Sequence, residues 1–180
     1  VVVAFEPGRQ LEIEQREQLD LEEIGERPDG VVERHDVDEI HQHGFGESTV
    51  VCLGGDRVIG TGYVDVLRLF EDDPETDLVI LIGEPGGGLE YPAAAYAAAM
   101  RTPVVAYITG QGSPRDARMG HAGAVVGDDE RSRPQNKMQA FSSAGLAVAQ
   151  RVTDIGEVVA RGLKLAADRS QCRNTQRRAR

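Results

Sequence analysis

Aromatic residues are scarce in this sequence: they make up 4% of its 180 residues, and tryptophan is absent. A core built from this composition must be aliphatic, which the hydrophobic content of 40% can supply. No apolar run approaches the roughly 20 residues that a membrane-spanning helix needs. The first ten residues also lack the basic region and cleavage pattern of a signal peptide. We therefore expect a cytoplasmic protein that does not contact a membrane.

Cysteine and lysine are rare as well. The two cysteines, Cys52 and Cys172, are too few for a disulfide framework, and Cys52 falls in a stretch that we predict to be a buried strand. Only two of the 20 basic residues are lysines, Lys137 and Lys164. The 30 acidic residues give a net charge of −10, which argues against non-specific binding to nucleic acids.

Charge divides the chain into three regions. Residues 1–43 contain 13 acidic and 4 basic residues with few apolar ones, so we expect this segment to be loosely ordered, weakly helical or disordered. Residues 164–180 carry 6 basic residues against 1 acidic residue and have no apolar helical stripe, which predicts a disordered basic tail. The composition therefore predicts one folded domain, residues 44–163.

Strand and helix signals alternate along this domain. Short apolar runs predict strands at residues 48–53, 77–83, 103–110, 122–127 and 146–151. The segments between and after them predict helices at residues 63–73, 91–101, 134–145 and 154–164. Strands that are apolar throughout and separated by helices indicate an α/β fold, with a parallel sheet covered by helices on both faces.

A candidate site follows from this arrangement, because ligand and catalytic groups of such folds collect beyond the carboxyl ends of the strands. Glu84 directly follows the second strand, and residues 86–88 form a glycine turn whose backbone N–H groups could face an anion. His121 lies in another loop of small residues, in "RMGHAGAVVG". A neutral imidazole can act as a nucleophile or a base when a carboxylate holds its second nitrogen, and Glu84 is the candidate carboxylate.

Each of these features also has an ordinary interpretation. A single histidine in a loop is more often a surface residue, a glutamate after a strand is usually a turn or cap residue, and a glycine run is usually a flexible turn. His41 and His43 lie two residues apart, but without further ligands at suitable spacing they indicate solvated side chains rather than a metal site. From the residues alone, the prediction goes no further than an α/β domain with a candidate His–Glu site and no metal site.

Four motifs carry a resemblance to a known family. "GFGESTVVCLGGDRVIGT", "VILIGEPGG", "PVVAYITG" and above all "RMGHAGAVV" resemble the alpha subunit of succinyl-CoA synthetase (succinate–CoA ligase), in its carboxyl-terminal, flavodoxin-like ligase domain. The resemblance runs in unbroken order from about residue 44 to about residue 163.

The resemblance implies an activity and roles for two residues. His121 matches the histidine that is transiently phosphorylated by succinyl phosphate, which forms when phosphate displaces CoA from succinyl-CoA. The phosphohistidine then delivers the phosphoryl group to ADP or GDP on a beta subunit. Glu84 matches the glutamate that orients this histidine. The resemblance further implies CoA as a substrate, no cofactor bound by this chain alone, and Mg²⁺ with the nucleotide on the beta subunit.

The resemblance has gaps at the beginning of the chain. The CoA-binding Rossmann-type domain of the family has no counterpart, and of the strand, turn and helix that precede "GFGEST" in the family only "VDEIHQHG" is similar to the end of the helix. We therefore expect the first strand of the sheet to be lacking or altered. A truncated or frame-shifted gene product that acts at most as a subunit-interaction module is one alternative. A related acyl-CoA ligase acting on acetate, malate or citrate is another.

Overall fold

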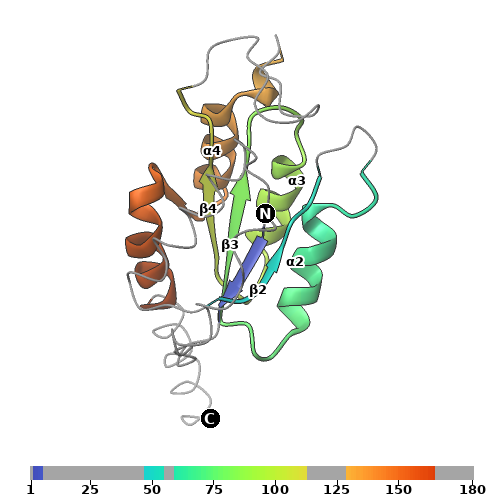
Figure 1. Ribbon diagram of the computed structural model, residues 1–180, viewed down its shortest axis with the longest axis vertical. Helices are drawn as coiled ribbons and strands as arrows, with labels where there is room; N and C mark the ends of the chain where they lie inside the picture. Colours follow the sequence, from blue (N-terminus) through green and yellow to red (C-terminus); the bar gives the residue numbers. More distant parts are fainter. Residues whose placement is uncertain (1, 6–46, 55–58, 113–128, 165–180) are drawn as a thin grey trace, which may run out of the picture.

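The structure, a computed structural model, describes residues 2–5, 47–54, 59–112 and 129–164. Within these residues, five strands form one sheet in the order β2-β1-β3-β4-β5 (Figure 1). The strands are β1 (Val2–Phe5), β2 (Glu47–Val51), β3 (Leu78–Gly83), β4 (Val104–Ile108) and β5 (Ala147–Ala149). This strand order is that of flavodoxin-like sheets, and the predicted α/β fold class is confirmed.

The direction of β1 differs from the predicted all-parallel sheet. β3, β4 and β5 are parallel neighbours, whereas β1 pairs antiparallel with both β2 and β3. β2 therefore runs in the same direction as β3. The first strand of the sheet is present but reversed, because an apolar run can fill a central position in either direction as long as its side chains are buried.

Residues of β1 belong to the core. Val2 and Ala4 have no solvent exposure, and they pack in the same cluster as Val79 and Leu81 of β3. The expectation of a loosely ordered segment is wrong for residues 2–5, since the acidic composition of residues 1–43 concealed one short apolar run at their start. Residues 6–43 lie outside the described part, and the domain boundaries at residues 43 and 163 stay predictions.

Helices cover both faces of the sheet, as predicted. α2 (Tyr63–Asp72), α3 (Glu90–Ala97) and α4 (Pro134–Ser143) share one core cluster, and residues 155–164 form a helix that packs in a second cluster. Because successive side chains of a strand point to opposite faces, β3 contributes to both. Val79 and Leu81 face the first cluster, and Leu78, Ile80 and Ile82 face the second.

α2 forms where the sequence predicts it. Its buried side chains Val66, Leu67 and Phe70 recur at helical spacing. At its start, the backbone N–H of Gly62 donates to the carboxylate of Asp65 at 3.0 Å, which satisfies one of the donors that a helix terminus leaves open.

α3 is shorter than the predicted helix over residues 91–101. It ends at Ala97, and from Ala99 on the amides make the tighter bonds of a turn: Ala99 N–H donates to the Tyr96 carbonyl at 3.0 Å. α4 begins at Pro134, which suits the first helical turn, and Gly145 follows its end with a φ of +80°.

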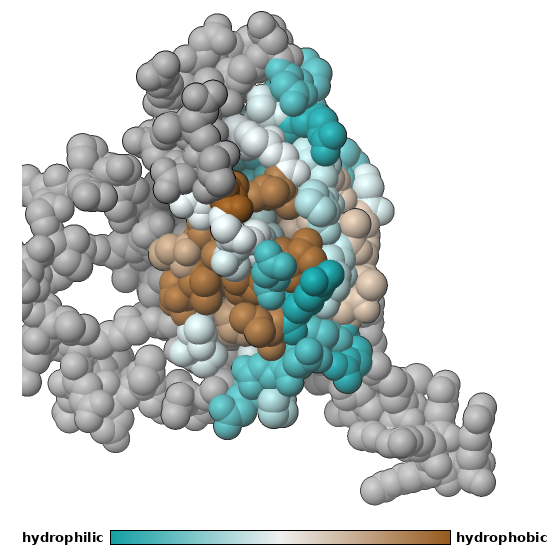
Figure 2. Space-filling view, turned by 90° about the vertical axis from the view of Figure 1, so that its right-hand side faces the viewer, coloured by the Kyte–Doolittle hydropathy of each residue, from teal (hydrophilic) through white to brown (hydrophobic). Residues whose placement is uncertain are grey.

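β2 is an edge strand and not the buried strand that we predicted. It ends at Val51, Val50 keeps 46% of its surface exposed, and Cys52 is exposed just beyond the strand. Figure 2 views the molecule from the side on which α2 and β2 lie, and it shows hydrophobic residues gathered in the middle of this face. The predicted strand over residues 122–127 lies outside the described residues.

No helix among the described residues is long and apolar enough to cross a membrane.

The end of α2 is tied to the chain just before β4 by the carboxylate of Glu71. Its oxygens accept the backbone N–H groups of Arg101 and Thr102 at 3.0 Å and the Arg101 Nε–H at 2.7 Å. Desolvation raises the pKa of this carboxyl, but the hydrogen bonds from Arg101 and Thr102 outweigh it and lower the pKa from its ordinary value of 4.5 to about 2.

Replacing this carboxylate gives a stability difference that depends on pH. Because folding lowers the pKa of Glu71, the ionised carboxylate stabilises the fold above pH 4.5, and this contribution is lost as pH falls from 4.5 to about 2. We expect Glu71→Gln to lower the free energy of unfolding by about 1 kcal/mol at pH 7, since exposed Arg101 is screened by solvent. Urea denaturation of the unaltered chain and of Glu71→Gln at pH 7 and at pH 2.5 measures the loss of stability at each pH. Asp72→Asn, at the exposed neighbouring position, is the control. An equal loss at both pH values would contradict this assignment.

Candidate functional site

The carboxyl ends of β2, β3 and β4 lie at one edge of the sheet, as predicted, whereas that of the reversed β1 lies at the other. β3 and β4 are parallel and in register, so Gly83 lies opposite Ile108. Val2 of β1 pairs with both Val51 of β2 and Leu81 of β3, which brings the end of β2 to the same edge. Residues that follow these three strands therefore share one rim, and Glu84 is one of them.

Gly83 ends β3 in a position that has no room for a side chain. A Cβ atom there would lie 2.7 Å from Cδ1 of Ile108 and 3.0 Å from Cγ and Oε1 of Glu90. Glycine at this position lets α3 approach the end of the strand, so that the Glu90 carboxylate comes close to the backbone of Glu84.

The glycine turn after Glu84 needs its glycines for conformation. Gly86 and Gly87 have φ values of +91° and +56°, a region that side chains disfavour. The Gly86 N–H donates to the carbonyl of Ser132 at 2.9 Å, which ties the turn to η2 (Glu130–Ser132), the 3₁₀ turn before α4. The expectation that this turn offers its N–H groups to an anion is therefore wrong for Gly86, because Ser132 occupies that donor.

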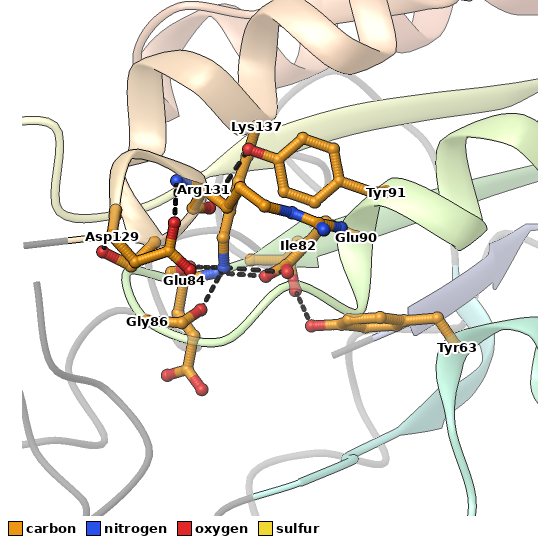
Figure 3. A network of polar contacts seen from close by, with 10 residues as sticks. Tyr63, Ile82, Glu84, Gly86, Glu90, Tyr91, Asp129, Arg131 and Lys137 are labelled. Atoms are coloured by element: carbon orange, nitrogen blue, oxygen red, sulfur yellow. Dashed lines mark hydrogen bonds and ion pairs between the residues drawn. The ribbon is translucent and has the colours of Figure 1, made fainter. Parts of the chain in front are cut away.

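A buried lysine lies under this turn. Lys137 of α4 has no side-chain exposure, and its Nζ forms an ion pair of 2.8 Å with Oε2 of Glu90, which is 4% exposed (Figure 3). The same Nζ donates to the carbonyl of Glu84 at 2.7 Å and to the carbonyl of Gly86. An ammonium group has three donors, and these three partners account for all of them.

Glu90 closes this network on the other side. Its Oε1 accepts the backbone N–H of Glu84 at 3.4 Å. The backbone of Glu84 is thus held twice, with its N–H bonded to Glu90 and its carbonyl bonded to Lys137.

Tyr63, at the start of α2, adds a neutral donor next to this network. Its hydroxyl donates to the carbonyl of Ile82 at 3.4 Å (Figure 3). Burial raises the pKa of Tyr63 far above its ordinary value, and the negative charges of Glu90 and Glu84 raise it further. Tyr63 therefore stays a hydroxyl donor at any physiological pH.

A cation lies on the outer side of the glycine turn. The guanidinium of exposed Arg131 lies 4.7 Å from the centre of the Tyr91 ring, and the Tyr91 hydroxyl donates to the Arg131 carbonyl at 3.1 Å. Stacking of this kind stabilises a cation over an aromatic face. A Cβ on Gly88 would come within 3.9 Å of the Arg131 guanidinium, so this positive charge lies beside the turn.

Of the two residues predicted for the site, Glu84 lies in the described part of the chain and His121 does not. Glu84 lies at the carboxyl edge of the sheet and is half-buried, and in Figure 3 its side chain points away from the Lys137 ammonium. His121 lies outside the described residues, as do His41 and His43. The contact between His121 and Glu84 therefore stays a prediction.

Sequence reasoning missed Lys137, Glu90 and Tyr63. Lys137 had one signal, since it is one of two lysines in a chain that otherwise uses arginine. For Glu90 and Tyr63 the sequence carries no comparable sign of burial, because polar side chains at the start of a helix usually face solvent. Among the described residues, no group of three or more His, Cys, Asp or Glu side chains could hold a metal ion.

The sheet with helices on both faces defines the class, an α/β domain. Residues 35–144, more than half of the chain, match the CoA-ligase family, and the chain belongs to this family. The resemblance stated from the sequence motifs is thereby confirmed at the level of the family.

Particular relatives are alpha subunits of succinate–CoA ligase (ADP-forming). The chain is 47% identical over 117 residues to subunit alpha 2 from Archaeoglobus fulgidus, which covers 65% of this chain and 40% of that protein. It is 39% identical over 131 residues to the alpha subunit from Staphylococcus aureus, which covers 72% of this chain and 43% of that protein. The chain thus spans about two fifths of the length of these relatives.

Among solved structures, the chain is similar to ATP citrate lyase from Methanothrix soehngenii, determined in complex with citrate and coenzyme A. The TM-score is 0.59 at 32% sequence identity, and the match covers 65% of this chain and 20% of that one.

Removing the buried ammonium tests the energetics of the network. We expect Lys137→Met to lower the free energy of unfolding by about 3–5 kcal/mol, because Glu90 is left as a buried charge without its partner. The double variant Lys137→Met/Glu90→Gln removes both charges, and we expect it to lose only about 1–3 kcal/mol, the cost of carbonyls that lack a donor. Urea denaturation of both variants measures the difference. A double variant less stable than Lys137→Met would contradict the ion pair.

The close approach at the end of β3 makes a second prediction on stability. Gly83→Ala forces Ile108 or Glu90 to shift, and we expect a loss of about 1–3 kcal/mol. Gly88→Ala is the matched control, because a Cβ there meets its nearest neighbour, Tyr91, at an ordinary 3.6 Å. Equal stability of the two variants in urea denaturation would show that the space beside Gly83 is not limiting.

Proposed function

We propose that this chain acts as an alpha-type subunit of succinate–CoA ligase, in which His121 carries a phosphoryl group between succinyl phosphate and a nucleoside diphosphate. The observation that supports the proposal is the position of Glu84, at the carboxyl edge of the sheet beside the glycine turn, in a chain that belongs to the CoA-ligase family. This is the carboxylate that the resemblance pairs with the phosphorylated histidine.

In the direction from succinyl-CoA to the nucleoside triphosphate, the proposed reaction has three steps. Inorganic phosphate attacks the thioester carbon of succinyl-CoA, the C–S bond breaks, and CoA leaves as its thiol. A ring nitrogen of His121 then attacks the phosphorus of succinyl phosphate, the P–O bond to the acyl group breaks, and succinate leaves. Finally an oxygen of the nucleoside diphosphate attacks the phosphorus, and the P–N bond breaks to regenerate the histidine.

Glu84 has a specific task in this scheme. By accepting a hydrogen bond from one ring nitrogen of His121, it keeps the other nitrogen unprotonated and directed at the phosphorus. Transfer of a phosphoryl group depends mainly on positioning and on charge stabilisation, so a carboxylate that fixes the ring contributes directly to the rate.

The proposal extends to the partner and the cellular site. The nucleotide, ADP or GDP, and its Mg²⁺ belong to a beta subunit, and the reaction takes place in the cytoplasm. CoA is a substrate, and no cofactor is assigned to this chain alone.

Phosphohistidine formation tests the proposal. The chain is incubated with a succinate–CoA ligase beta subunit, Mg²⁺ and γ-labelled ATP, and we expect an alkali-stable, acid-labile label on the chain. His121→Asn should abolish the label, and Glu84→Gln should slow its formation about a hundredfold. His35→Asn is the control and should label like the unaltered chain. No label on the unaltered chain would leave the alternative of an inactive subunit-interaction module.

A second experiment tests which carboxylic acid is the substrate. Besides succinate, citrate is a candidate, because the chain is similar to ATP citrate lyase. Labelled complex is mixed with CoA and, in turn, succinate, acetate, malate or citrate. We expect succinate to discharge the label fastest. If citrate discharged the label and the other three acids did not, the result would favour the alternative of a related acyl-CoA ligase that acts on citrate.

A further inference from the structure

We infer that Lys137 and Glu90 are positioning residues, which set the backbone of Glu84 so that its carboxylate faces the histidine in phosphoryl transfer. This inference rests on the proposed function and adds two residues to it. Neither residue is assigned a contact with substrate.

The first support is where the bonds of the pair are directed. Lys137 Nζ contacts the carbonyl of Glu84 at 2.7 Å, and Glu90 Oε1 contacts the N–H of Glu84 at 3.4 Å. Two side chains from two different helices thus hold the peptide groups on both sides of one residue. The hydrogen bond from Lys137 to the Gly86 carbonyl extends the same hold to the glycine turn.

The second support is that a buried ion pair is in general a weak source of net stability. Buried ion pairs can often be replaced by uncharged side chains of similar volume with little loss of stability, because burying two charges costs about what their attraction returns. The pair is also fully enclosed, with side-chain exposures of 0% for Lys137 and 4% for Glu90. A fully enclosed pair with all three ammonium donors in use contributes a fixed geometry, which apolar side chains cannot supply.

The third support is the need for rigidity at this point of the chain. Glu84 is followed by a turn in which Gly86 and Gly87 have positive φ values, and glycine allows many backbone conformations. A carboxylate attached to such a turn has a defined direction only when the backbone is held by other contacts. Lys137 and Glu90 supply those contacts, together with the bond from the Gly86 N–H to Ser132.

The double variant Lys137→Met/Glu90→Gln separates positioning from folding. It removes the ammonium donors and both charges, while the remaining side chains keep a similar volume. Lys164→Met/Glu157→Gln is the matched control, because it makes the same substitutions at two exposed positions of the last helix. Urea denaturation first establishes the conditions under which each variant is fully folded, and both measurements below are made there.

The first measurement is amide hydrogen exchange in the full chain. In the double variant, we expect exchange at the hydrogen-bonded amides of Glu84 and Gly86 to accelerate at least about tenfold relative to Ile80 in the middle of β3. The control should leave this ratio unchanged. An unchanged ratio in the double variant overturns the inference, whatever the labelling shows.

The second measurement is phosphorylation with the beta subunit, as a function of ATP concentration. We expect the maximal labelling rate per folded double variant to fall about a hundredfold, with the KM for ATP within about twofold of the unaltered chain. A merely structural role predicts an unchanged rate per folded molecule, and that result overturns the inference while leaving the proposed function intact. An unaltered chain that takes up no label overturns the proposed function, and the positioning role falls with it.

Discussion

A buried positive charge holds the carboxyl edge of this sheet together. The Lys137 ammonium comes from α4, its counter-ion Glu90 comes from the first turn of α3, and its carbonyl partners follow β3. The consecutive elements β3 and α3 therefore meet α4, which lies much later in the sequence, at one nitrogen atom. Since an unpaired buried ammonium is costly, the arrangement of these elements is restricted to the one in which all three donors find an acceptor.

The position of this charge decides what the rim can offer. The ammonium uses the carbonyl groups of the glycine turn, and the Gly86 N–H is used by Ser132. The turn is thus bonded inward to the body of the domain, in contrast to a loop whose N–H groups face outward to bind an anion. The side chain of Glu84, which follows β3, points away from the ammonium (Figure 3).

The sheet reaches a flavodoxin-like strand order by an unusual route. The central position between β2 and β3 is filled by residues 2–5, which run antiparallel to both neighbours. A reversed central strand still buries Val2 and Ala4 completely and still brings the ends of β2 and β3 to one edge. The candidate site lies where the carboxyl ends of β2, β3 and β4 meet, and these three strands all run in the same direction.

The elements that were predicted well are those in which local pattern and final burial agree. Every residue of β3 is buried, in agreement with the strand that its unbroken apolar run predicted. α2 was equally clear, because its apolar residues recur at helical spacing and a proline follows it. β2 has an apolar run of the same kind but lies at the edge of the sheet, so Cys52 is exposed. Apolar character alone does not tell a central strand from an edge strand.

The sequence by itself determined the alternation of strands and helices, the family, and the place of Glu84 at the end of a strand, because these depend on residues close together in the chain. Tertiary structure alone decided the direction of β1 and the burial of Lys137 with Glu90. Lys137 and its carbonyl partner Glu84 are 53 residues apart, and a lysine in a polar helix carries no local sign of burial. Its partners become visible only when the sheet brings α3, α4 and the end of β3 to the same point.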